Sequence, residues 1–96
     1  MAGRWEGAGA FDRTELDLRP TGEFAFVVYR QGREDGAVRG TWNVEFGELV
    51  LTVREDTTGE GAAARVMRCE LRSVEPDRFV LYAWETRKAV PYTRAR

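Results

Sequence analysis

The clearest pattern in the chain is an alternation of apolar and polar residues in its middle, from Val38 to Phe46. Every second residue from Val38 is apolar or glycine (Val38, Gly40, Trp42, Val44 and Phe46), and the residues between them are polar. A period of two is typical of a β-strand with one buried face. We therefore predict a strand over residues 37–46 with Trp42 inside the core, because aromatic side chains bury large areas.

The same kind of pattern predicts seven further strands and no helix. They are expected at residues 4–6, 14–19, 23–30, 48–54, 63–73, 78–86 and 90–94. No segment has the 3.6-residue period of an amphipathic helix. The 96 residues are enough for one domain. We expect an all-β fold over 1–96: a single antiparallel up-and-down meander of about eight strands, closed or nearly closed into a small barrel, since closure removes both unpaired edges.

The predicted connections alternate in length. Longer ones cover 7–13, 31–36 and 55–62, and the tight turns contain Pro20–Gly22, Phe46–Gly47 and Glu75–Asp77. In a meander, successive connections lie at opposite ends, so the tight turns and both termini share one end, here called the closed end. The longer connections share the other end, here called the mouth. Eight strands leave an interior that side chains fill or that holds one small ligand. We expect a mostly filled barrel with a pocket under the longer connections.

Several motifs, in order, resemble those of one family. Gly3-Arg4-Trp5 matches a Gly-x-Trp signature, Gly40-Thr41-Trp42 is followed by Gly47-Glu48-Leu49-Val50-Leu51, and Asp77-Arg78-Phe79-Val80-Leu81 matches a late strand. With Leu16 to Phe24, these resemble small bacterial lipocalin-like (calycin-type) domains. The resemblance implies a cup-shaped barrel that is closed by a first Trp and a last-strand Arg and open at the other end to small apolar ligands. Trp5 and Arg94 would take those two positions.

Composition narrows the chemistry. There is no histidine and one cysteine, Cys69, which removes imidazole bases, Ser-His-Asp triads and thiolate metal clusters. Fifteen basic residues against sixteen acidic ones disfavour a nucleic-acid partner or an anionic membrane. We expect a protein that is not an enzyme and has no cofactor or metal, with Cys69 as a small buried apolar residue.

The location of the protein is predicted from what the chain lacks. The N-terminus has no apolar signal-peptide core, and no apolar run reaches the length of a membrane span. We expect a cytoplasmic protein without a membrane span, although a chain trimmed of its leader would have the same sequence.

Charged residues that continue the inward faces towards the mouth are the candidate ligand-binding residues. They are Arg30, Glu55, Arg65 and Glu85. An apolar pocket with a few polar groups is the usual small-molecule site. The other interpretation is a set of solvated rim charges or mutual ion pairs. A single β-bulge would reverse which side chains point inward.

Aromatic residues on the predicted outer faces suggest an interface. Tyr29, Tyr82 and Trp84 are the candidates, although a loop or a terminus could cover them instead. Two functions follow. The first is a non-enzymatic barrel that binds a small, partly apolar ligand at the long-loop end, with Arg30 or Arg65 orienting any anionic group. The alternative is a protein-interaction or homodimerising module with a filled core and no ligand.

Overall fold

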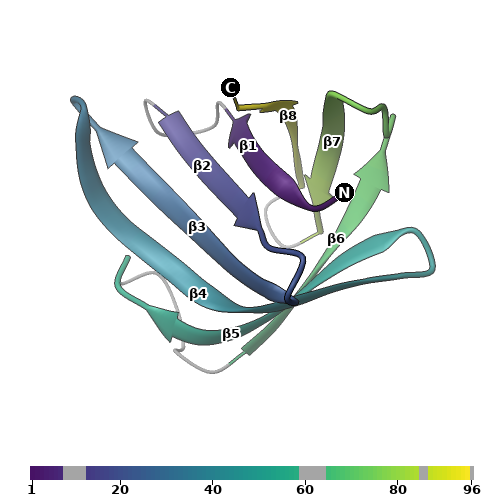
Figure 1. The fold of residues 1–96 in the computed structure, drawn as a ribbon, viewed down its shortest axis with the longest axis horizontal. Helices are drawn as coiled ribbons and strands as arrows, with labels where there is room; N and C mark the ends of the chain where they lie inside the picture. The colour runs from purple at the N-terminus through teal and green to yellow at the C-terminus, as the bar shows by residue number, and fades with distance from the viewer. Residues whose placement is uncertain (8–12, 59–64, 85–86, 96) are drawn as a thin grey trace.

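The computed structural model describes residues 1–7, 13–58, 65–84 and 87–95, and these form one closed β-barrel (Figure 1). Its strands are β1 (Gly3–Gly7), β2 (Arg13–Leu18), β3 (Glu23–Arg30), β4 (Arg33–Glu45), β5 (Glu48–Asp56), β6 (Arg65–Arg72), β7 (Arg78–Ala83) and β8 (Lys88–Arg94). Each strand is antiparallel to the next, and β8 pairs with β1 to close the sheet. The predicted all-β, up-and-down fold of eight strands is therefore confirmed. Among the described residues, no helix is long and apolar enough to cross a bilayer.

The closed end is built around Trp5. Its side chain is 1% exposed, and its ring meets Phe79 edge to face with centroids 4.6 Å apart. The Arg94 guanidinium lies 4.3 Å above the Trp5 ring, and the Trp5 indole donates to the Met1 carbonyl at 3.0 Å. The positions predicted for Trp5 and Arg94 are confirmed, and the two residues come together because β1 and β8 pair in this register.

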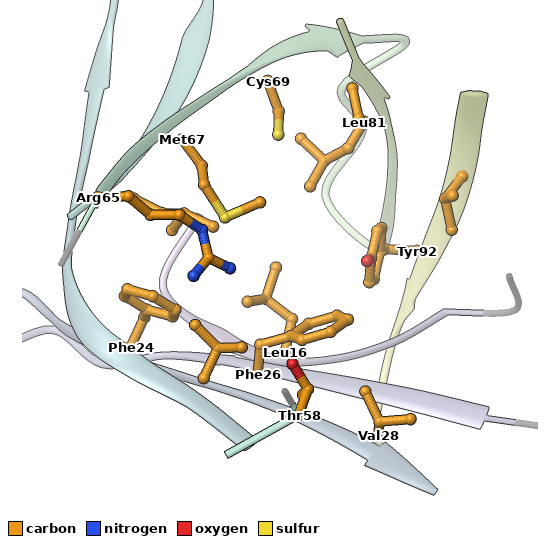
Figure 2. A pocket seen from close by; sticks show the side chains of 14 residues that line it. Leu16, Phe24, Phe26, Val28, Thr58, Arg65, Met67, Cys69, Leu81 and Tyr92 are labelled. Carbon is orange, nitrogen blue, oxygen red and sulfur yellow. The ribbon is translucent and has the colours of Figure 1, made fainter. Parts of the chain in front are cut away.

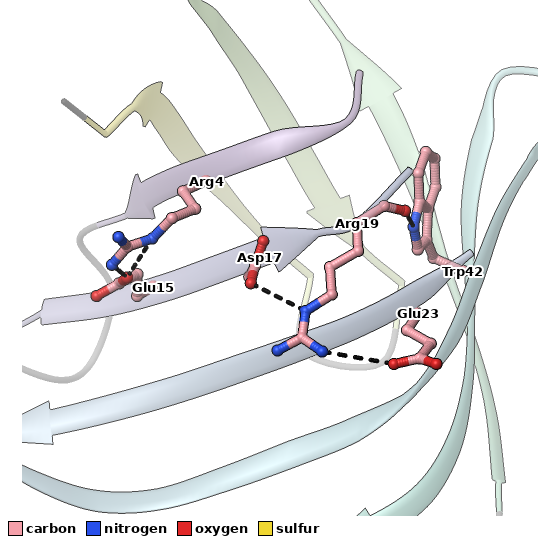
Figure 3. Close-up of polar contacts among 6 residues, drawn as sticks. All are labelled: Arg4, Glu15, Asp17, Arg19, Glu23 and Trp42. Atoms are coloured by element: carbon pink, nitrogen blue, oxygen red, sulfur yellow. Dashed lines mark hydrogen bonds and ion pairs between the residues drawn. The ribbon is translucent and has the colours of Figure 1, made fainter. Parts of the chain in front are cut away.

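Trp42 lies nearer the rim of the closed end than predicted. It is half-buried against the core, and its indole nitrogen donates to the Arg19 carbonyl in the β2–β3 turn at 2.8 Å (Figure 3). Two later members of its apolar set, Val44 and Phe46, are 43% and 99% exposed. The prediction that they share a buried face with Trp42 is wrong, because the turn between β4 and β5 projects from the barrel, at the right of Figure 1.

The connection after β3 is also shorter than predicted. The polar composition of residues 31–36 predicts a loop, but β4 already begins at Arg33 and only Gln31 and Gly32 turn the chain. Both have positive φ, 52° and 76°, as a tight hairpin turn of this hand requires. The polar residues that suggest a loop, Arg33, Glu34 and Asp35, are exposed in a hairpin at the mouth.

Ion pairs cover much of the outer surface of the barrel. Figure 3 shows Arg4 paired with Glu15 and Arg19 paired with both Asp17 and Glu23 on the outer face of β1 to β3. On β4 to β6, Arg39, Arg68 and Arg72 also have carboxylate partners. Exposed pairs of this kind contribute about 0–1 kcal/mol each to stability, so they neutralise surface charge and add little to the free energy of unfolding.

Candidate functional site

A cavity of about 290 Å³ lies inside the barrel, between the closed end and the mouth. Most of the side chains that line it are apolar. The lining residues are Leu16, Phe24, Phe26, Val28, Val38, Leu51, Thr58, Arg65, Met67, Cys69, Leu81, Ala83, Val90 and Tyr92 (Figure 2). An apolar cavity of roughly 150 Å³ is large enough to bind benzene, so this space is about twice what a small apolar molecule requires. The interior is therefore less completely filled than the size of its aromatic residues suggests.

A β-bulge decides which acidic residue points into the barrel. The register between β4 and β5 shifts after Arg39. Gly40 pairs with Val53 and Arg39 pairs with Glu55, so Arg54 is the bulged residue, with no position opposite it on β4. The extra residue moves Glu55 to the outer face, where it lies 3.9 Å from the Arg39 guanidinium. The prediction that Glu55 lines the pocket is wrong for this reason. Asp56, which pairs with the cavity-lining Val38, takes the inward position instead.

Asp56 is held by Thr58, two residues further along the chain. Its Oδ1 atom accepts hydrogen bonds from the Thr58 amide at 2.8 Å and from the Thr58 hydroxyl at 2.5 Å. Thr57 joins this turn to β4, because the Thr57 amide donates a hydrogen bond to the Ala37 carbonyl at 2.9 Å. Gly36 leaves room for the turn, since a Cβ there would lie 3.0 Å from the Thr58 Cα. An Asp side chain that accepts from the backbone amide two residues later forms an Asx turn, and the alternation of apolar and polar residues does not reveal this turn at Asp56.

Arg65 brings a positive charge into the cavity. It lines the cavity as predicted, and in Figure 2 its guanidinium extends from β6 into the space beside Met67. Its Nη1 atom lies 2.8 Å from Asp56 Oδ2, in an ion pair whose carboxylate side chain is 1% exposed and whose guanidinium side chain is 24% exposed. The Thr58 hydroxyl and amide, together with Arg65, hold the pKa of Asp56 below its ordinary value against the opposing effect of burial. Asp56 is therefore ionised at neutral pH, and the pair as a whole is neutral.

The other predicted ligand-binding residues are placed differently. Arg30 is exposed in the β3–β4 hairpin and pairs with Asp35 at 2.8 Å, so it is not among the lining residues. Its predicted position in the pocket is wrong because β3 and β4 continue past the cavity as a hairpin, and Arg30 lies in that extension. Glu85 lies outside the described residues.

The predicted interface residues fall on two sides of the barrel. Tyr29 is on β3, half-buried beneath the Arg13 guanidinium, which lies 4.2 Å from its ring centroid. Tyr82 lies in β7 and Trp84 directly follows it, with their rings edge to face at 4.9 Å, and three strands separate β7 from β3 in either direction. Trp84 is 54% exposed. The three aromatic residues therefore do not form one patch.

Tyr92 places a phenol in the cavity wall. It is 6% exposed and its ring stacks on Phe79 with centroids 5.3 Å apart. Burial raises the pKa of the Tyr92 phenol from 10.0 to about 12, because the phenolate would lose its hydration. The folded protein therefore holds this proton at a pH where the unfolded chain releases it.

This difference predicts a loss of stability in alkaline solution. The contribution of Tyr92 is fully present below pH 10 and disappears as the pH rises from about 10 to about 12. A pKa difference of this size corresponds to about 3 kcal/mol. Urea unfolding of the wild type and of Tyr92→Phe at several pH values measures it. The wild type should lose about that much more stability than the variant, and parallel pH profiles would contradict the assignment.

The described residues contain no cluster of three or more His, Cys, Asp or Glu side chains that could hold a metal ion. Cys69 is buried and lines the cavity, as predicted for a small apolar residue. No protein-family model matches the chain, and no curated protein sequence matches it either.

Proposed function

We propose that the barrel binds a small, largely apolar molecule inside its cavity and has no catalytic role. The observation that carries this proposal is the cavity itself: about 290 Å³ of mostly apolar space with Arg65 in its wall. A pocket near 300 Å³ with a few polar groups is at the lower limit for small-molecule sites. The ligand would be correspondingly small, such as a medium-length alkyl chain or a compact ring system.

The energy for binding would come from burial of the apolar part of the ligand. Each CH₂ group removed from water contributes roughly 0.8 kcal/mol, so an alkyl chain of about eight carbons gains several kcal/mol before the cost of association. Arg65 would then orient the single polar group of the ligand, because it is the charged residue among the described lining residues.

The closed end supports the resemblance to lipocalin-like domains. Trp5 plugs the barrel, and Arg94 covers its ring, which is the arrangement that the resemblance implies. We propose on this basis that the chain is a small lipocalin-like barrel. A closed end of this kind leaves the mouth, where β5 ends and β6 begins, as the side from which a ligand enters.

The proposed function predicts that a bulky side chain in the cavity blocks binding. Ala83 lines the cavity, whereas Ala89 is exposed on β8, so Ala83→Phe and Ala89→Phe add the same ring inside and outside the barrel. NMR titration with n-octanol should give saturable shifts of cavity methyl groups in the wild type and in Ala89→Phe. Ala83→Phe should weaken the affinity at least about tenfold, since the ring competes for the same space. Equal affinity in all three proteins would contradict the proposal.

One observation favours a second function. Trp84 is more than half exposed beside Tyr82, whose ring also lies 4.1 Å from the Arg72 guanidinium. Exposed Trp, Tyr and Arg side chains are enriched at protein interfaces. A protein-interaction or homodimer surface on β6 and β7 is therefore the alternative. The sequence-based form of this alternative has a filled core, whereas the barrel contains a cavity. A monomer by light scattering at high protein concentration would remove homodimerisation.

A further inference from the structure

We propose that Asp56 makes the cavity selective for uncharged ligands that carry a hydrogen-bond acceptor, such as an alcohol or a ketone, over carboxylates. This inference rests on the proposed function, because it concerns the ligand of the same cavity. It changes the expectation drawn from sequence, in which an arginine at the mouth orients an anionic group.

The charge of Arg65 is already balanced inside the protein. Asp56 is not among the residues that line the cavity, and its side chain is 1% exposed and lies 2.8 Å from the Arg65 guanidinium. The carboxylate is also fixed from its other side by two hydrogen bonds from Thr58. A ligand that reaches Arg65 therefore meets a neutral ion pair rather than an isolated positive charge.

A ligand carboxylate would be poorly stabilised at this position. It would lose its hydration on entering the apolar cavity, and removing an ion from water is costly unless a full counter-charge replaces the water. Arg65 would have to serve two carboxylates at once, and the ligand and Asp56 would repel each other across the guanidinium. The described lining residues include no second cation that could compensate.

An uncharged acceptor avoids this cost. The guanidinium carries five N–H donors, and the Arg65 side chain lines the cavity and is 24% exposed. A hydroxyl or carbonyl oxygen can accept a hydrogen bond from such a group without adding a charge. The apolar remainder of the molecule can then pack against residues such as Phe26, Met67 and Leu81.

The test compares n-octanol with octanoate at pH 7, since they share an alkyl chain and differ in charge. NMR titration should show n-octanol binding the wild type at least about tenfold more tightly than octanoate. Asp56→Asn keeps the side-chain shape and removes the counter-charge of Arg65. It should strengthen octanoate binding about tenfold or more and change n-octanol binding less than about threefold.

Asp35→Asn is the matched control. It removes one negative charge from the same end of the barrel, but Asp35 is exposed and paired with Arg30 outside the cavity. Octanoate affinity should change less than about twofold in this variant, because solvent screens its charge. If Asp35→Asn strengthened octanoate binding as much as Asp56→Asn does, the inference would be overturned. The net charge of the protein, and not the buried Asp56–Arg65 pair, would then explain the gain in affinity.

The outcomes separate the two proposals. If neither ligand shifts the cavity methyl groups of the wild type, the proposed function fails. If both bind and octanoate is as tight as n-octanol, the selectivity inference fails and the proposed function stands. This wild-type comparison needs no variant, so the inference is open to refutation even if Asp56→Asn does not fold.

Discussion

Replacing Trp5 with alanine is expected to destabilise the barrel by about 4 kcal/mol, because it removes a fully buried indole and leaves a cavity in its place. The Trp5 side chain is 1% exposed at the closed end, packed on Phe79 and covered by Arg94. Domains of this size are stable by only about 5–15 kcal/mol, so the loss would be a large part of the total. Urea denaturation followed by far-UV circular dichroism measures it.

The other two tryptophans provide the comparison. Trp42 is half-buried and donates one hydrogen bond to Arg19, so Trp42→Ala should cost about 1–2 kcal/mol. Trp84 is 54% exposed, so Trp84→Ala should cost less than about 1 kcal/mol. If Trp42→Ala proves more damaging than Trp5→Ala, the description of the closed end is incorrect.

Substitution of Gly40 by alanine is expected to cost about 3 kcal/mol or more. A Cβ at this position would lie 1.9 Å from the Thr52 carbonyl oxygen and 3.1 Å from the Phe24 ring. Thr52 is in β5 beside the bulge, so the obstacle is paired backbone and cannot rotate away as a side chain can. Overpacking usually costs about 1–3 kcal/mol, and the backbone clash places this case at or above the upper limit. Thermal unfolding of the variant checks it.

Gly32→Ala is the control for the loss of a glycine. Gly32 has a φ of +76°, but a Cβ at this position would have no neighbouring atom within 4 Å, so only backbone strain of about 1 kcal/mol is expected. The cost of Gly40→Ala should exceed that of Gly32→Ala at least twofold. Equal costs would mean that β4 and β5 do not approach as closely as described.

The strands could be predicted from the sequence because their buried faces repeat every second residue. Glu23–Arg30 is found with its predicted boundaries, and the Trp5–Arg94 arrangement follows from the pairing of the first and last strands. The β4–β5 turn could not be predicted in the same way. The apolar residues Val44 and Phe46 continue the alternation of Trp42, yet they lie on a projecting hairpin where they remain exposed.

The site was only partly predictable for a geometric reason. Arg65 can be found from the sequence because no bulge interrupts the β5–β6 pairing between it and the core. If the alternation of inward and outward residues is continued along β5 past Val53, Glu55 is predicted to point inward. Asp56 takes that position instead, because Arg54 is the extra residue of the bulge. Register shifts depend on how neighbouring strands twist and pack, and the alternation within one strand does not report them.

The most direct test of ligand binding inside the barrel is the set of intermolecular nuclear Overhauser effects between n-octanol and the methyl groups of the protein. Binding in the cavity predicts contacts from the alkyl chain to Met67, Leu81 and Val90, which line it. It also predicts no contacts from the alkyl chain to the methyl groups of Val66 and Val74, which are 57% and 58% exposed. Contacts restricted to exposed methyl groups, with none to the lining residues, would contradict binding inside the barrel.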